Sequence, residues 1–346
     1  MTEKAELGFD VERLAAYLRD ALPELQDNLT AMTKIGGGQS NPTYKMRFGD
    51  LDVVLRKQPR GDLLPSAHAV DREYRVQKAL AATDVPVPKM LHLCEDRTVI
   101  GSLFYVMEAL DGRVFHDSLI PGVSPKERAA IYDSMNDTLV KLHKVDWRAI
   151  GLDGFGKTGH YFERQIRRWT RQWHASKTRD IPEIDRLIAW LPNNRAQDDE
   201  TTIVHGDYRL GNLMFHPEQP EVIAILDWEL STLGHPLADL AFNGMLWHAT
   251  PDMYVGIAGH DLPTLGIPSL EDYVGRYCRN AGRNDGIETF HLAFSMFRFA
   301  VIFEGIAKRA LQGNATAENA EDVGRLSESY AKLAWSLVEK GDELRP

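Results

Sequence analysis

Apolar positions near the start of the chain recur at the spacing of a helix. Val11, Leu14, Leu18 and Leu22 are separated by three or four residues, and Asp10 stands where an N-cap would lie. From about residue 31 the pattern changes to short strand-like runs. Strands are predicted at 43–48 and 51–56 around the turn Gly49-Asp50, and again at 90–95 and 102–108, with a helix between them at 67–82. This first part predicts a small sheet accompanied by helices.

After residue 112 the pattern is mainly helical. Long amphipathic runs predict helices at 125–143, 161–176, 270–280, 290–312 and 321–340. A short β-rich island, 202–228, interrupts them. The chain is therefore expected to be α+β, with a β-rich N-terminal lobe over 1–110 and a larger helical lobe over 111–346.

Composition narrows the class of protein. Among 346 residues, 40 Lys and Arg stand against 50 Asp and Glu, a net charge of −10 that argues against nucleic acid as a partner. The two cysteines could form at most one disulfide bridge, which excludes a disulfide scaffold. The charged opening and the absence of a long uncharged apolar stretch predict a cytoplasmic protein without a signal peptide or membrane span. Nothing in the sequence indicates an obligatory protein partner.

The segment 205–229 carries the strongest chemical signal. His205-Gly206-Asp207 is followed five residues later by Asn212, and Asp227 ends the apolar run 222–226. A hairpin formed by 213–215 and that run would bring Asn212 and Asp227 together. Two oxygen ligands and a further carboxylate suit Mg²⁺. Each residue alone could be a turn or capping residue, but the whole set has the spacing of a phosphoryl-transfer loop, with Asp207 as the base.

Phosphoryl transfer also requires groups that hold the nucleotide. A glycine-rich segment precedes the strand at 43–48, and it contains Gly36, Gly37, Gly38, Ser40 and Asn41. Backbone N–H groups in such a turn can approach phosphate oxygens, although three glycines can equally form a plain flexible turn.

The next strand supplies the expected cation. Arg56 and Lys57 are adjacent in 53–57, and strand alternation directs them to opposite faces. We expect Arg56 to contact phosphate, because a guanidinium can bind phosphate and carboxylate together. Glu73, in the following helix, is the predicted carboxylate partner.

Together these segments resemble the aminoglycoside phosphotransferase and choline kinase group, which shares the two-lobed protein-kinase-like fold. Within it the chain is most similar to the kinase-like domain attached to some acyl-CoA dehydrogenases. The resemblance covers roughly residues 30–310 and is carried by the segments 36–44, 54–57, 104–108, 205–212 and 226–229.

The resemblance implies ATP and Mg²⁺ as cofactors and a role for each matched position. Asp207 matches the catalytic base, Asn212 and Asp227 match the magnesium ligands, and Arg56 with Glu73 matches the phosphate-pairing couple. The segment from Met107 through Glu108 to Leu110 matches the interlobe hinge, whose backbone would hold adenine. The Asp-Trp-Glu at 227–229 and the lack of an Ala-Pro-Glu signature favour a small-molecule acceptor.

The acceptor is harder to predict. The stretch 161–173 combines Trp169 and Trp173 with four arginines, and Arg298 interrupts the apolar run 290–312. These residues could bind a large anionic acceptor, or the tryptophans could simply face the core. A basic wall argues against a polycationic aminoglycoside. The resemblance suggests a hydroxyacyl-CoA or a similar hydroxylated metabolite.

Two other functions stay open at this point. A nucleotide-binding pseudokinase or adaptor would share the fold. A metal-dependent hydrolase could use His205, Asp207, Asp227 and His235, but this would leave Arg56 without a role. Asp239 we interpret as an acceptor for the backbone of the loop at 205–207, and His205 as a buried loop residue rather than a base.

Overall fold

Contacts divide the chain of the computed structural model into two units. The structure describes residues 8–36, 41–59, 68–195, 200–311 and 320–341. The first unit comprises Met1–Gly112, Ile150–Leu152 and Ala224–Glu229. The second comprises Arg113–Ala149, Asp153–Ile223 and Leu230–Pro346. Asp227 therefore groups with the β-rich N-terminal part, although it lies far along the sequence.

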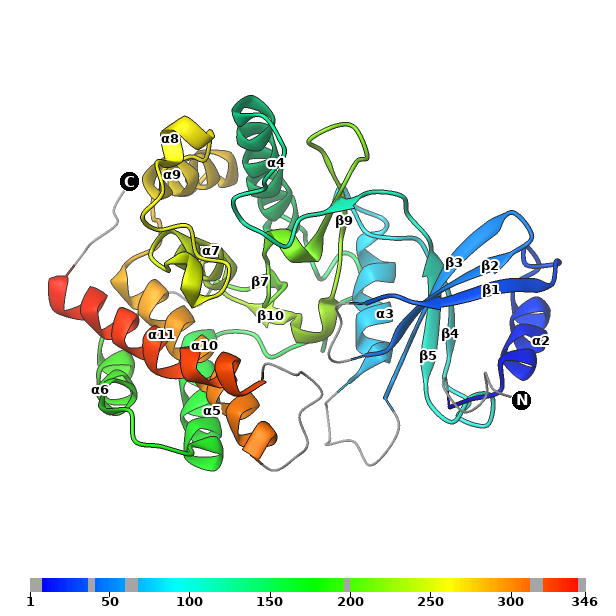
Figure 1. Ribbon diagram of the computed structural model, residues 1–346, viewed down its shortest axis with the longest axis horizontal. Coiled ribbons are helices and arrows are strands. Elements are labelled where there is room, and N and C mark those ends of the chain that lie inside the picture. The colour runs from blue at the N-terminus through cyan, green and yellow to red at the C-terminus, as the bar shows by residue number, and fades with distance from the viewer. Residues whose placement is uncertain (1–7, 37–40, 60–67, 196–199, 312–319, 342–346) are drawn as a thin grey trace. The chain divides into compact units, whose positions relative to one another are not determined.

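An antiparallel sheet forms the centre of the first unit (Figure 1). Its strands are β1 (Leu29–Lys34), β2 (Thr43–Phe48), β3 (Leu51–Lys57), β4 (Met90–Cys94) and β5 (Phe104–Glu108), in the order β1-β2-β3-β5-β4. Phe48 pairs with Leu51, so Gly49 and Asp50 make the two-residue turn that the sequence predicted. Gly49 has φ +57°, a conformation that suits glycine in such a hairpin.

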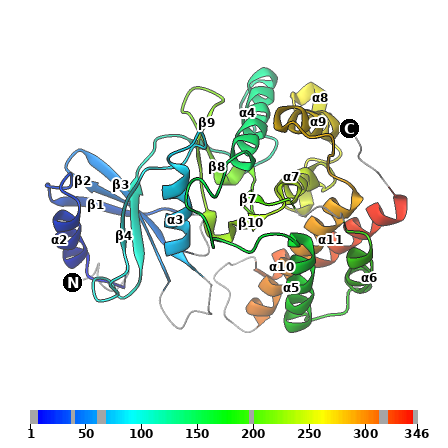
Figure 2. The ribbon, with the colours of Figure 1, turned by 180° about the vertical axis from the view of Figure 1, so that it is seen from behind.

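Two helices in the described part of this unit cover opposite faces of the sheet (Figures 1 and 2). Helix α2 (Val11–Ala21) begins after Asp10, whose side chain accepts from the N–H of Arg13, and it packs on the face that carries Leu55 and Val106. Helix α3 (Val70–Leu80) packs on the other face, against Tyr105. Because successive residues along a strand point to opposite faces of the sheet, adjacent residues within β3, or within β5, contact different helices.

The second unit is mainly helical. Its helices are α4 (Pro125–His143), α5 (Tyr161–Ser176), α6 (Pro182–Trp190), α7 (Pro236–Gly244), α8 (Leu262–Leu265), α9 (Leu270–Ala281), α10 (Thr289–Leu311) and α11 (Ala320–Lys340). Helices α4 and α5 have the predicted bounds, and Ser124 caps α4 by accepting from the N–H of Glu127. The sequence interpretation did not include α6.

Short strands in the second unit position its loops. β7 (Thr202–Val204) pairs with β10 (Thr232–Gly234), and β6 (Arg113–Val114) pairs with β8 (Leu213–Phe215). β9 (Val222–Ile225) completes the sheet β6-β8-β9, and its last two residues already belong to the first unit. The 3-10 turns among the described residues are Leu191–Asn193, Leu210–Asn212, Met245–Trp247, Pro251–Met253 and Trp228–Leu230, and the last of these begins in the first unit.

Helix α10 lies at the core of the second unit, where it packs against α5, α7 and α11. In the described part of the chain, it alone is long and apolar enough to cross a membrane. However, 89% of its apolar window is buried inside the protein, which is typical of the central helix of a globular domain.

Candidate active site

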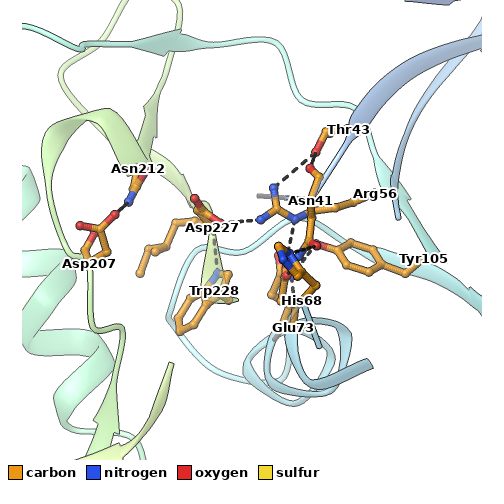
Figure 3. Close-up of polar contacts among 12 residues, drawn as sticks. Asn41, Thr43, Arg56, His68, Glu73, Tyr105, Asp207, Asn212, Asp227 and Trp228 are labelled. Atoms are coloured by element: carbon orange, nitrogen blue, oxygen red, sulfur yellow. Dashed lines mark hydrogen bonds and ion pairs between the residues drawn. The ribbon is translucent and has the colours of Figure 1, made fainter. Parts of the chain in front are cut away.

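Arg56 lies at the centre of a buried polar network in the first unit (Figure 3). Its Nε lies 2.8 Å from Oε2 of Glu73, and its Nη2 lies 2.5 Å from Oδ1 of Asp227. The N–H at Nε is not aligned with the Glu73 oxygen, so this contact is an ion pair rather than a well-directed hydrogen bond. Nη1 donates to Oγ1 of Thr43 at 3.3 Å. The predicted ion pair between Arg56 and Glu73 is therefore present, and Asp227 is a second carboxylate partner.

Strand alternation explains why Arg56 rather than its neighbour reaches Glu73. Val53 and Leu55 belong to the core on the α2 face of the sheet. Lys57 points to that face too, where its Nζ lies 5.8 Å from the centroid of the Phe9 ring and donates to the carbonyl of Gln58 at 2.7 Å. Arg56 has the opposite direction and meets α3.

Glu73 is held by further donors on the same face. Its side chain is only 1% exposed, and it accepts from Asn41 Nδ2 at 2.6 Å and from the Tyr105 hydroxyl at 3.1 Å. Burial raises the pKa of Glu73, and the charge of Arg56 and the bonds from Tyr105 and Asn41 oppose that rise. For Arg56, burial works against the charged form, but the nearby carboxylates, Glu73 above all, raise its pKa well above the ordinary value. The arginine stays charged at any physiological pH.

Asp227 has a strained backbone at the end of β9. Its φ is +62°, in the left-handed region that aspartate tolerates better than most residues, at a cost of about 1 kcal/mol or more. The following indole, Trp228, donates from Nε1 to the carbonyl of Ile225 at 2.9 Å and is buried. Strained polar residues of this kind concentrate at functional sites. The side chain of Asp227 remains 33% exposed.

In the second unit, Asp239 holds the loop that bears Asp207. Its Oδ2 accepts from the N–H of His205 at 2.6 Å, and its Oδ1 accepts from the N–H of Gly206 at 2.8 Å. Burial raises the pKa of Asp239, but the hydrogen bond and charge of His143 and the other donors outweigh it and lower the pKa below the usual value. The expected structural role of Asp239 is confirmed, and His205 is fully buried as expected.

Asp207 and Asn212 form a pair on this loop (Figure 3). Asn212 Nδ2 donates to Oδ2 of Asp207 at 2.7 Å and to its backbone carbonyl at 2.9 Å. Arg209 approaches the same Oδ2 at 3.4 Å. The Asp207 side chain is 23% exposed, so this carboxylate is held in place and still open to solvent.

The side chain of Asn212 offers an oxygen of the kind that binds magnesium. Because both contacts of Asn212 use its amide nitrogen, its Oδ1 points away from Asp207 and accepts nothing from the described residues. An amide oxygen is the kind of hard oxygen ligand that Mg²⁺ takes alongside carboxylates, phosphate oxygens and water. Conversely, no group of three His, Cys, Asp or Glu side chains in the described part of the chain could hold a metal.

The glycine-rich segment predicted to bind nucleotide is described only in part. Gly37, Gly38 and Ser40 lie outside the described residues, and Gly36 is exposed. Asn41 is buried and its side chain is committed to Glu73 and, through Oδ1, to His68 Nδ1 at 3.1 Å.

The predicted hinge begins at the end of β5. Glu108 accepts from the N–H of Lys89 through Oε1 at 2.6 Å, and its own N–H donates to the Lys89 carbonyl. Leu110 follows β5 and is half-buried, and its backbone bonds to no other described residue.

The residues predicted to bind the acceptor are packed into the second unit. Trp173 is 1% exposed, Trp169 is 9% exposed, and both face the core, which is the alternative that the sequence left open. Arg298 is buried as well, and its Nη2 donates to the carbonyl of Gly206. Sequence reasoning missed this contact because nothing local links α10 to the loop before Asp207.

Comparison with known proteins identifies the family. The sequence profile described as the phosphotransferase enzyme family, APH, matches residues 31–273. A solved Ralstonia eutropha structure, provisionally named an aminoglycoside phosphotransferase, is 47% identical and covers 96% of this chain and 99% of its own, with a TM-score of 0.87. A thermostable mutant of aminoglycoside phosphotransferase APH(4)-Ia, solved with AMP-PNP and hygromycin B, is 14% identical over 92% of this chain and 98% of its own, with a TM-score of 0.60.

Curated relatives extend the comparison. Acyl-CoA dehydrogenase family member 10 of Mus musculus is 46% identical over 95% of this chain, and family member 11 of Rattus norvegicus is 44% identical over 94%. The chain spans only 31% and 43% of these relatives' lengths.

The two-lobed kinase-like fold and the family match define a small-molecule kinase. The chain belongs to the APH phosphotransferase family.

Proposed function

We propose that the chain transfers the γ-phosphoryl group of ATP to a hydroxyl of a small metabolite, with a hydroxyacyl-CoA as the leading candidate. The observation that carries this proposal is the pairing of Asp207 with Asn212 on a loop anchored by Asp239. The pairing presents a fixed, solvent-accessible carboxylate beside an amide oxygen that is free to bind a cation.

Asp207 acts as the general base in this proposal. A carboxylate held by Asn212 and Arg209 can accept the proton of an attacking hydroxyl as the oxygen–phosphorus bond forms. Orientation by these fixed neighbours is the main contribution, because phosphoryl transfer depends mainly on positioning and charge stabilisation.

Asn212 and Asp227 would hold Mg²⁺, which neutralises the phosphate oxygens when it is bound. Arg56 would contact the phosphates from the first unit. Its guanidinium is oriented by Glu73, which is itself fixed by Asn41 and Tyr105. The same guanidinium pairs with Asp227 through Nη2, so nucleotide binding would have to redistribute these contacts.

The acceptor class rests on the surface of α5 and on the relatives. Arginines 167, 168 and 171 are exposed on this helix, which suits anionic groups better than a polycationic aminoglycoside. Arg298, whose guanidinium lies 5.6 Å from the centroid of the Trp169 ring, connects α5 to the Gly206 carbonyl of the loop. The relatives' names include acyl-CoA dehydrogenase, which directs attention to acyl-CoA metabolites.

An acceptor screen tests the proposal. ATP consumption with Mg²⁺ would be measured with hydroxyacyl-CoAs, amino alcohols and aminoglycosides, each against the same acyl-CoA or amine without its hydroxyl. We expect turnover with a hydroxyacyl-CoA and none with the deoxy control. Equal consumption with both would show that no hydroxyl receives the phosphate. Turnover with aminoglycosides alone would contradict the acceptor class.

A further inference from the structure

Arg298 is a buried charge whose partners are not carboxylates. The residue is 7% exposed on α10, and no ion pair joins it to an acidic side chain in the described ranges. Its Nη2 donates to the carbonyl of Gly206, and its guanidinium lies 5.6 Å from the Trp169 ring centroid and 5.3 Å from that of Phe242. Buried arginines are normally paired with acids, so this arrangement calls for a specific reason.

The carbonyl that Arg298 contacts belongs to the peptide bond that enters Asp207. A peptide unit is planar, so its C=O and N–H groups move together. Arg298 holds the oxygen of this unit, and the ring nitrogen Nδ1 of His205 accepts from its N–H, that of Asp207, at 3.2 Å. Both edges of the peptide plane are therefore held by side chains from different parts of the second unit.

Gly206 gives this peptide its orientation. Its φ is +84°, and a Cβ at this position would lie 2.8 Å from the carbonyl oxygen of Leu230. Its own N–H is bound by Asp239. With that N–H, the carbonyl and φ all fixed, the direction in which the next residue projects its carboxylate is fixed too.

We propose that Arg298 is a positioning residue for phosphoryl transfer, which holds the Gly206–Asp207 peptide so that the Asp207 carboxylate is presented to the acceptor. This inference rests on the proposed function of Asp207 as the base. The faces of Trp169 and Phe242 hold the guanidinium by cation–π contact, so its donors remain available to the carbonyl. Arg298 itself touches no reacting atom.

Arg128 offers a matched control. It is also a buried arginine of the second unit, 6% exposed, that donates to backbone carbonyls, those of Ile120 at 3.0 Å, Val123 at 3.2 Å and Leu265. None of these carbonyls belongs to the loop around Asp207. Arg128→Met should therefore reproduce the loss of stability that follows removal of a buried guanidinium, without moving Asp207.

The experiment compares Arg298→Met, Arg298→Lys and Arg128→Met in the full chain, with Mg·ATP alone as the probe and water in place of the acceptor. For Arg298→Met we expect kcat for ATP hydrolysis to fall about 10²-fold, with KM for ATP within about twofold, because a displaced base affects the transition state more than nucleotide binding. The kcat of Arg298→Lys should be roughly tenfold higher than that of Arg298→Met, since lysine restores one N–H donor. Arg128→Met should keep the wild-type kcat.

Hydrogen exchange of the amides in 205–208 gives a readout that needs no turnover. We expect faster exchange there in Arg298→Met and unchanged exchange in Arg128→Met. Wild-type kcat and exchange in Arg298→Met, or an equal loss of kcat in both Met variants, would overturn the inference. Should Arg298→Met fail to fold, Arg298→Lys decides, because wild-type kcat in that variant would also overturn it.

Asp207→Asn separates this inference from the proposed function. If Asp207→Asn hydrolyses ATP at the wild-type rate, the base assignment fails, and exchange at 205–208 still decides whether Arg298 holds the peptide. If Asp207→Asn is impaired and Arg298→Met is not, only the positioning role fails.

Discussion

Replacement of Arg56 should lower both the stability of the protein and its affinity for nucleotide. Replacement by Met preserves much of the apolar stem but deletes the guanidinium that lies 2.8 Å from Glu73 and 2.5 Å from Asp227. The Arg56 side chain is 11% exposed and that of Glu73 is 1% exposed, so water cannot readily replace the lost cation. The variant leaves a buried carboxylate without its counter-charge.

The expected magnitude follows from that burial. Breaking one side of a buried ion pair costs about 3–5 kcal/mol of unfolding free energy, because the remaining charge stays desolvated. Glu73→Gln removes the other charge and can keep a bond from Asn41 or Tyr105. The double variant should therefore be more stable than the sum of the single losses predicts, by at least about 2 kcal/mol. Affinity for Mg·AMP-PNP should fall at least about thirtyfold in Arg56→Met, which corresponds to about 2 kcal/mol.

Urea unfolding and calorimetry of the single and double variants measure these two quantities. Lys57→Met is the matched control, because Lys57 is the adjacent buried cation and faces α2 instead of α3. Its coupling to Glu73 should be within about 0.5 kcal/mol of zero, and its nucleotide affinity should stay within about twofold of wild type. A coupling near zero for Arg56, or a larger loss of nucleotide affinity in Lys57→Met, would refute the reasoning.

Two further predictions concern metal and pH. In Asp227→Asn the new asparagine can adopt the same left-handed backbone, so the variant removes only the charge of the carboxylate. Calorimetry should show that Mg²⁺ no longer strengthens ATP binding to this variant, and an unchanged magnesium effect would contradict the assignment. Burial, with a smaller contribution from His235, lowers the pKa of His291 to about 3, below that of an exposed histidine. The unfolded chain then takes up the proton first as pH falls, so His291 should cost about 2 kcal/mol of stability between pH 7 and pH 5. Urea unfolding should show this loss in wild type and not in His291→Gln, and an equal loss in both would contradict it.

Local patterns predicted much of the fold. The bounds of α4 and α5 followed from the spacing of apolar residues. The two-residue period of a strand placed Arg56 and Lys57 on opposite faces, and the chemistry of the guanidinium favoured Arg56 as the partner of Glu73.

Contacts between distant segments could not be predicted in the same way. Tyr105 and Asn41 support Glu73 from a strand and a loop 32 residues away on either side, and Arg298 reaches Gly206 across 92 residues. No periodicity encodes such pairs. The amphipathic pattern of α5 likewise placed Trp169 and Trp173 on one face without deciding whether that face meets the core or an acceptor.

Transfer of labelled γ-phosphate tests the central claim most directly. Wild type and Asp207→Asn would be incubated with Mg²⁺, γ-labelled ATP and a hydroxyacyl-CoA, and the label would be followed into a phosphate monoester of that acceptor. The account predicts labelled ester with wild type and a yield rate roughly 10²–10⁴-fold lower with a folded Asp207→Asn, at nearly unchanged ATP affinity. Equal rates for the two proteins would contradict the assignment of Asp207 as the base.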